Sequence, residues 1–165
     1  MPIGLRDISG HEHEKYMRMA LAEAAIAGER GDLPIGAVIV HEGRVAATGS
    51  NRIHSTRTSL AHAETTALHL CAQYLHEHGR ESIVYTTLEP CVMCLATIIQ
   101  SNIRNIVFAM EDNYMKTGLA VSGVPWLTDR MFNYLGGVLR EESLALLRRY
   151  CGERDYNAIV HGRPK

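Results

Sequence analysis

Two short segments contain residue types that bind and use a metal ion. One is His62-Ala63-Glu64, and the other is Pro90-Cys91-Val92-Met93-Cys94. Residues three apart on a helix lie on the same face, so Cys91 and Cys94 can present both sulfurs to one ion. The partial positive charge of a helix N-terminus also lowers the pKa of a thiol and stabilises the thiolate that binds metal.

One imidazole would complete a three-ligand set with the two cysteines, and His62 can supply it. A Cys/Cys/His set leaves one tetrahedral position for water, which is typical of catalytic rather than structural zinc. Zinc lowers the pKa of such a water towards neutrality. Glu64 is not needed as a ligand, and its place two residues after His62 lets it take a proton from the water. The pattern therefore predicts a hydrolytic zinc site with Glu64 as the proton carrier.

Each segment alone has a simpler interpretation. A single Cys-x-x-Cys that opens a helix can be a redox pair, and a single His-x-Glu is usually a solvated helix start. A closed structural zinc site would need a fourth ligand, but Cys71 and Cys151 have no known ligand spacing to Cys91 and are expected to pack as small apolar residues. The two segments together, with 25 residues between Glu64 and Pro90, favour catalytic zinc.

Hydrophobic periodicity and turn residues predict the elements that position these segments. Helices are predicted at residues 11–29, 61–78, 91–100 and 141–150, and strands at 35–41, 44–50, 82–87, 105–109 and 137–140. Residues 111–126 are expected to form a loop that has room for a helical turn. Alternating strands and helices predict an α/β sheet that is antiparallel at the first hairpin and parallel afterwards.

The composition limits the class of protein. The 165 residues are 46% hydrophobic and 21% charged, which fits one domain spanning 1–165. Lys and Arg number 17 against 18 acidic residues, so the net charge of −1 gives no strong field for phosphate backbones. No export signal or membrane span is visible, and four unevenly spaced cysteines make a poor disulfide scaffold. We therefore expect a cytoplasmic, reducing setting.

The motifs resemble those of the cytidine/deoxycytidylate deaminase superfamily, in the branch that contains fungal-type cytosine deaminases, guanine deaminases and bacterial tRNA adenosine deaminases. His-x-Glu followed by Pro-Cys-x-x-Cys is the signature of zinc-dependent nucleobase deaminases. The similarity extends over residues 34–40, 51, 61–64, 86–94 and 116–118. It implies a three-layer cytidine-deaminase-like α/β fold, with a five-stranded mixed sheet flanked by helices, and a homodimer.

The resemblance also implies roles for individual residues. His62, Cys91 and Cys94 would hold Zn²⁺, and Glu64 would be the catalytic proton shuttle. Asn51, eleven residues before the zinc histidine, would hydrogen-bond the substrate base. By its type alone, Asn51 would more often be a turn former.

Two tyrosines are further candidates for substrate binding by resemblance. Tyr114 falls where fungal-type cytosine deaminases place an aromatic residue of the pocket. Asp155-Tyr156 resembles the tail segment that closes over small bases in the free-base enzymes. Tyr114 and Tyr156 can equally be half-buried packing residues. The segment 111–126 and the C-terminal tail are equal candidates for a lid.

The substrate is predicted from smaller features. Residues 87–94 and 116–118 favour the tRNA enzymes, but Thr58-Ser59-Leu60 stands where those enzymes usually have Asp-Pro-Thr, and the arginines of 148–154 are interleaved with acids. We therefore predict a hydrolytic deaminase of a small free base of the cytosine or guanine type, with tRNA disfavoured as a partner. The alternative is a tRNA-specific adenosine deaminase. A non-catalytic zinc-stabilised interaction module is the alternative of another class, which Glu64 and the three-ligand set disfavour.

Overall fold

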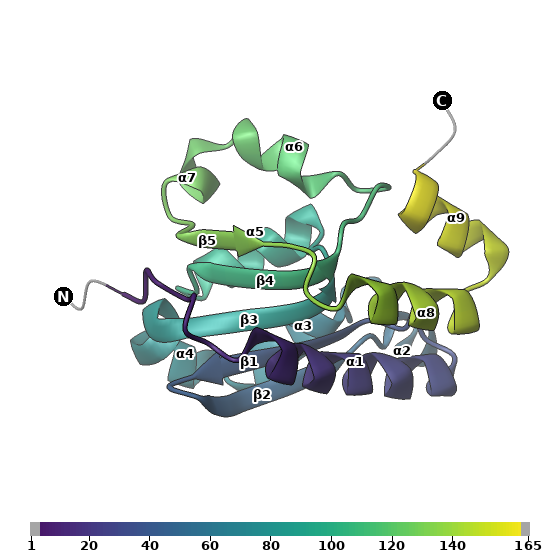
Figure 1. The fold of residues 1–165 in the computed structure, drawn as a ribbon, viewed down its shortest axis with the longest axis horizontal. Coiled ribbons are helices and arrows are strands. Elements are labelled where there is room, and N and C mark those ends of the chain that lie inside the picture. The colour runs from purple at the N-terminus through teal and green to yellow at the C-terminus, as the bar shows by residue number, and fades with distance from the viewer. Residues whose placement is uncertain (1–3, 163–165) are drawn as a thin grey trace.

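The computed structural model describes residues 4–162 and places a five-stranded sheet between two layers of helices (Figure 1). Its strands are β1 (Gly36–His41), β2 (Arg44–Ser50), β3 (Ser82–Leu88), β4 (Asn105–Met110) and β5 (Asn133–Leu135). Their order is β2-β1-β3-β4-β5. Strand β1 is antiparallel to β2 and β3, whereas β3, β4 and β5 are parallel. The predicted mixed sheet is confirmed.

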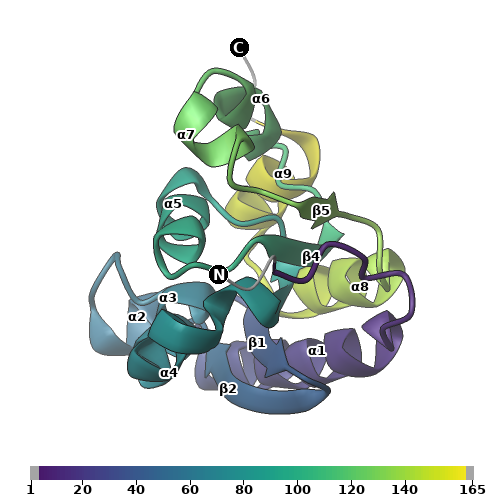
Figure 2. The ribbon, with the colours of Figure 1, turned by 90° about the vertical axis from the view of Figure 1, so that its left-hand side faces the viewer.

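The longer helices cover both faces of the sheet (Figure 2). Helices α1 (His13–Arg30) and α8 (Arg140–Tyr150) lie on one face, and α3 (Ala63–Leu70), α4 (Ala72–His78) and α5 (Val92–Gln100) on the other. The connections contain the short segments α2 (Ile53–Thr56), η1 (Gly79–Glu81), α6 (Thr117–Ser122) and α7 (Pro125–Thr128), and α9 (Glu153–His161) follows α8. Within 4–162, every helix is too short or too polar to cross a lipid bilayer.

Strand β1 shows how one sheet supports both layers. Val38 and Val40 pack with Met17 of α1, while Ile39 packs with Ile98 of α5 on the opposite side. This division follows from the strand geometry, because successive side chains point to opposite faces. Strands β3 and β4 are buried along their whole length, as expected for strands covered on both faces.

Two glycines set how closely helices approach the sheet. A Cβ added at Gly36 of β1 would lie 2.0 Å from the carbonyl oxygen of Ala20 in α1. One added at Gly49 of β2 would lie 2.2 Å from the carbonyl oxygen of Ala63, the first residue of α3. The first turn of α3, which follows His62, is therefore in direct contact with the backbone of β2.

Some predicted boundaries are wrong. The last strand is 133–135 rather than 137–140, because the chain turns away at Gly136, which packs against the Phe108 ring, and at Gly137, which has a φ of 94°. The predicted helix 61–78 is divided at Cys71, whose φ of −122° and ψ of 19° are not helical. The predicted loop 111–126 contains α6 and the start of α7, and the tail forms α9.

Candidate active site

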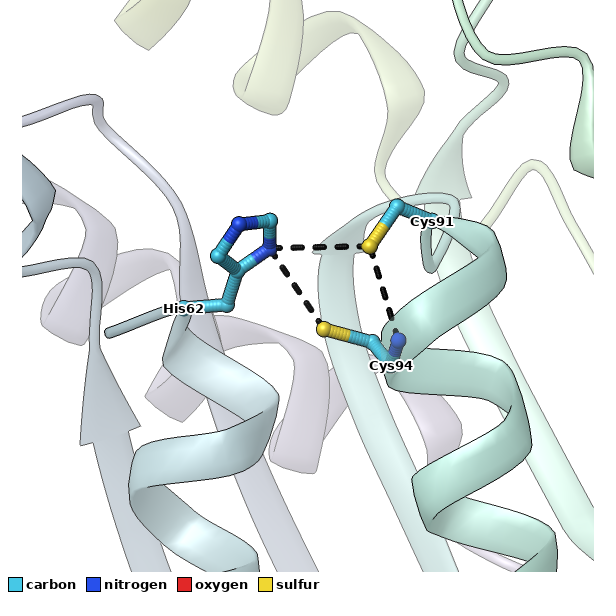
Figure 3. Close-up of side chains that lie close together, drawn as sticks. All are labelled: His62, Cys91 and Cys94. Carbon is cyan, nitrogen blue, oxygen red and sulfur yellow. Dashed lines mark hydrogen bonds between the residues drawn. The ribbon is translucent and has the colours of Figure 1, made fainter. Parts of the chain in front are cut away.

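Two helix starts bring His62, Cys91 and Cys94 together (Figure 3). His62 immediately precedes α3, and Cys91 immediately precedes α5. The Nδ1 atom of His62 lies 3.7 Å from Sγ of Cys91 and 3.4 Å from Sγ of Cys94. The three ligand atoms all lie within 4.8 Å of one another. These residues form a group that could hold one metal ion.

The electrostatics of this group suit a divalent cation. A hydrogen bond from the Cys94 thiol lowers the pKa of Cys91 to about 4 in spite of burial, and His62 adds to the effect. The same contact raises the pKa of Cys94, and the hydrogen bond with Cys91 raises that of His62. A divalent cation bound here would favour the deprotonated form of both thiols. Two thiolates and an imidazole are the donor set that zinc prefers.

Glu64 lies beside the three ligands in the first turn of α3 and is 3% exposed. Its Oε1 atom is 3.1 Å from the hydroxyl of Thr86, and its Oε2 atom is 3.5 Å from Sγ of Cys94. Burial raises the pKa of Glu64, and the negative charge of Cys91 contributes to the shift. A carboxyl group with a raised pKa, next to a candidate metal site, is suited to accepting and returning a proton.

A cavity of about 560 Å³ adjoins these side chains. Its lining includes His62, Glu64 and Cys91. Apolar side chains contribute much of the wall: Leu33, Ile35, Ile53 and Leu88. A mostly apolar cavity with a few convergent polar groups is typical of a small-molecule site, and its size accommodates a nucleobase.

Asn51 also lines this cavity and is 1% exposed. Its Oδ1 atom accepts a hydrogen bond from the Ile53 N–H (3.2 Å), but within residues 4–162 its Nδ2 atom has no hydrogen-bond partner. A buried amide donor without a partner is costly. A ligand with an acceptor atom would remove that cost, which is consistent with the predicted base-binding role.

The two predicted aromatic residues occupy different places. Tyr114 lines the cavity. Tyr156 does not, because its hydroxyl faces Arg148 and accepts a hydrogen bond from Nε (2.9 Å). Its neighbours Asp155 and Asn157 line the cavity instead. A substrate contact by either tyrosine stays a prediction.

Residues 11–110 match the family model of the cytidine and deoxycytidylate deaminase zinc-binding region. The match covers more than half of the chain and contains both segments of the candidate metal site. The chain belongs to the cytidine and deoxycytidylate deaminase family. It is a zinc-dependent deaminase of nucleobases or nucleosides.

Several relatives of this deaminase carry assigned activities. The chain is 35% identical over 151 residues to the tRNA-specific adenosine deaminase of Agrobacterium fabrum, covering 87% of this chain and 96% of the relative. A solved structure from a study of A-to-I editing by tRNA:A34 deaminases is 34% identical, with a TM-score of 0.71, over 81% of this chain and 99% of the other. A guanine deaminase structure from Nitrosomonas europaea is 28% identical, with a TM-score of 0.67, over 83% of each chain.

The cavity of this deaminase also contains two carboxylates that the sequence motifs did not single out. Glu89 accepts hydrogen bonds from the Tyr134 hydroxyl (2.7 Å) and the Asp112 N–H (3.1 Å). Asp112 in turn accepts one from the Tyr114 N–H (2.9 Å), and burial raises the pKa of Asp112. Each follows the end of a buried strand, and Glu89 also lies within the segment 86–94 that resembles the deaminases.

Helix α9 supplies another wall of the cavity. Arg154, Asp155, Asn157 and Ile159 belong to this wall. Asn113 holds the helix in place, because its N–H donates to the Ile159 carbonyl (3.0 Å) and its Nδ2 atom to the Val160 carbonyl (2.8 Å). Both segments considered as lids, 111–126 and the tail, therefore contribute to the cavity.

Proposed function

We propose that this deaminase acts on adenosine in a tRNA, with His62, Cys91 and Cys94 as zinc ligands. The observation that carries the reaction is the convergence of these side chains beside the buried carboxyl of Glu64. Zinc, when bound, acidifies water and so supplies the nucleophile. Glu64 would carry one proton from that water to the ring nitrogen, and then a second proton, from the hydroxyl group added to the ring carbon, to the amine that leaves as ammonia. Asn51 donates a hydrogen bond from Nδ2 to an acceptor of the base.

The comparisons support the RNA substrate. The Agrobacterium fabrum relative is named a tRNA-specific adenosine deaminase and aligns over 96% of its length. This finding weighs against our sequence-based preference for a free base, which rested on Thr58-Ser59-Leu60, on the arginines of 148–154 that are interleaved with acids, and on the net charge of −1. Affinity for RNA depends on the phosphates that individual basic groups contact, so a near-neutral chain can still bind through a local surface. A homodimer and a cytoplasmic location remain predictions of the resemblance.

Deamination of a free base is the second candidate, and the cavity gives it specific support. Glu89, Asp112 and Asp155 all line the cavity. Carboxylates at these positions repel the phosphates of a nucleic acid but can accept hydrogen bonds from the amino groups of a small base. The guanine deaminase structure from Nitrosomonas europaea is also similar over 83% of this chain.

One screen separates the two candidates. Zinc-loaded protein is incubated with an anticodon stem-loop that carries adenosine, and separately with guanine, cytosine, adenine and their nucleosides. We expect inosine in the RNA by mass spectrometry and RNA binding that weakens steeply with salt. Ammonia from a free base, without inosine in the RNA, would assign the second candidate. No product from any substrate would contradict both and favour the interaction module.

Replacement of Glu64 tests the proton transfer. Glu64→Gln keeps the size of the side chain and should retain zinc, while turnover falls by about 10²–10⁴-fold, the usual contribution of a general acid–base group. Ammonia release and metal analysis measure the two effects. Glu77→Gln, at a side chain 79% exposed, is the matched control and should leave both unchanged. Activity of Glu64→Gln within tenfold of the native protein would exclude the role.

A further inference from the structure

A partly buried ion pair lies next to the backbone of Asn51. The side chain of Asp32, in the connection between α1 and β1, is fully buried and 2.7 Å from Nε of Arg30, the last residue of α1. The carboxylate of Asp32 also accepts hydrogen bonds from the N–H groups of His54 and Ser55 (both 2.9 Å) and from the Ser55 hydroxyl (2.8 Å). Asp32 therefore fixes the first turn of α2, which begins two residues after Asn51.

Arg30 fixes the other side of the same segment. While its Nε atom binds Asp32, its second guanidinium nitrogen donates to the carbonyl oxygen of Asn51 (2.6 Å) and to the Ser50 hydroxyl (3.1 Å). A planar guanidinium can serve these partners together, whereas the single ammonium of a lysine cannot reproduce the arrangement. Arg30 is thus the link between the carboxylate of Asp32 and the backbone of Asn51.

Hydrogen bonds of the backbone and of Oδ1 restrict the orientation of the Asn51 side chain. The N–H of Asn51 donates to the Ile35 carbonyl (2.9 Å), and the next N–H, of Arg52, donates to the Ala61 carbonyl (2.9 Å) beside His62. The side-chain Oδ1 atom is occupied by the Ile53 N–H. Of the polar groups of Asn51, Nδ2 is the one left without a partner within residues 4–162, and Asn51 lines the cavity with His62.

We propose that Arg30 and Asp32 are positioning residues that hold the Nδ2 atom of Asn51 in the orientation that binds the substrate base. The inference rests on the proposed function, because it takes Asn51 as a substrate contact. Neither residue of the ion pair touches the base. Each acts through the backbone of 50–55, so the loss of either lets the amide of Asn51 reorient and weakens binding more than it slows the chemical step at Glu64.

The test combines Arg30→Lys with Asn51→Ala, using the adenosine stem-loop and guanine as substrates. In the native background, Arg30→Lys should raise KM about tenfold, the scale of one lost charge-assisted hydrogen bond, with kcat changed less than threefold. In the Asn51→Ala background it should change KM less than twofold, because the group that it positions is gone. Arg18→Lys, an exposed position of α1, is the control.

A second measurement does not depend on turnover. In nitrogen–proton NMR spectra, the side-chain amide of Asn51 should give one sharp pair of signals in the native protein and shifted or broadened signals in Arg30→Lys. Ser55→Ala removes one hydrogen bond to Asp32 and should move the same signals if Arg30→Lys fails to fold. Zinc content should not change in any variant.

The outcomes are separable. An equal rise in KM with and without Asn51, or unmoved amide signals, would overturn the positioning role. Native protein that turns over neither substrate would overturn the proposed function, while the amide signals would still decide whether the ion pair orients Asn51.

Discussion

Glu64 and Asp32 are both buried carboxylates, yet their pKa values move in opposite directions. Burial raises the pKa of Glu64, whose contacts are a hydroxyl and a thiol. Asp32 also experiences burial, but backbone N–H groups, a hydroxyl and the Arg30 guanidinium outweigh it and lower its pKa to about 2. The partners, rather than burial itself, decide the direction. Glu64 is thereby suited to carry a proton, and Asp32 to stay charged.

This difference predicts a pH-dependent stability. Because the pKa of Asp32 is about 2 when folded and about 3.9 when unfolded, its ionised form stabilises the fold above pH 4, and this contribution disappears as the pH falls towards 2. Solvent screening of Arg30, which is 25% exposed, reduces the effect to roughly 1–2 kcal/mol. The free energy of unfolding of native and Asp32→Asn protein, measured in urea at pH 7 and pH 3, should differ less in acid. A difference that is the same at both pH values would contradict this account.

At the level of single residues, the sequence predicted that His62, Cys91 and Cys94 come together, but not the ion pair that contacts the backbone of Asn51. His62, Cys91 and Cys94 lie at helix starts whose local patterns are short and recognisable. Arg30 and Asp32 are two residues apart in sequence, but their partners at 50–55 are about 20 positions away. Nothing local marks such a long-range network, because each residue alone is an ordinary charged group near a turn.

Among the elements, the close packing of α3 on β2 should control the position of His62 and Glu64. Gly49→Ala would bring a Cβ within 2.2 Å of the Ala63 carbonyl, so α3 must shift. We expect a loss of about 1–3 kcal/mol of stability, typical of overpacking, together with weaker zinc binding. Thermal denaturation and metal competition measure both. Gly10→Ala, where an added Cβ meets nothing within 4 Å, should be neutral, and equal effects at the two positions would exclude the packing explanation.

The main strands and helices were predictable because their burial is periodic or continuous along the chain. The wrong predictions concern short elements whose formation depends on distant parts of the chain. Residues 133–135 form a strand by pairing with 105–107, a distant partner that three residues cannot reveal. Helix α9 carries Tyr156, Ile159 and Val160 on one face, but nine residues give a weak helical period. Their burial depends on packing against Ile35, Leu88 and Leu144, which are distant from α9 or belong to other elements.

For the molecule as a whole, zinc would join helices that start far apart in the sequence. A ligand that binds the folded chain alone stabilises it by about 2.7 kcal/mol at a hundred times its dissociation constant. A strong chelator should therefore lower the melting temperature of the native protein. His62→Ala should melt lower and respond little to chelator, whereas Cys151→Ala should keep the response. A native melting temperature unaffected by chelator would show that zinc contributes nothing to the fold.

The wall that α9 gives to the cavity has a consequence for how specificity can change. The residues of α9 follow the last residue of the family match by more than 40 positions, so they are separate in sequence from the proposed zinc ligands and from Glu64. Exchange of this terminal helix between relatives would alter which rings fit while leaving the reactive centre intact. Chimaeras joined at Cys151 should accordingly inherit chemistry from their first 150 residues and selectivity from the remainder.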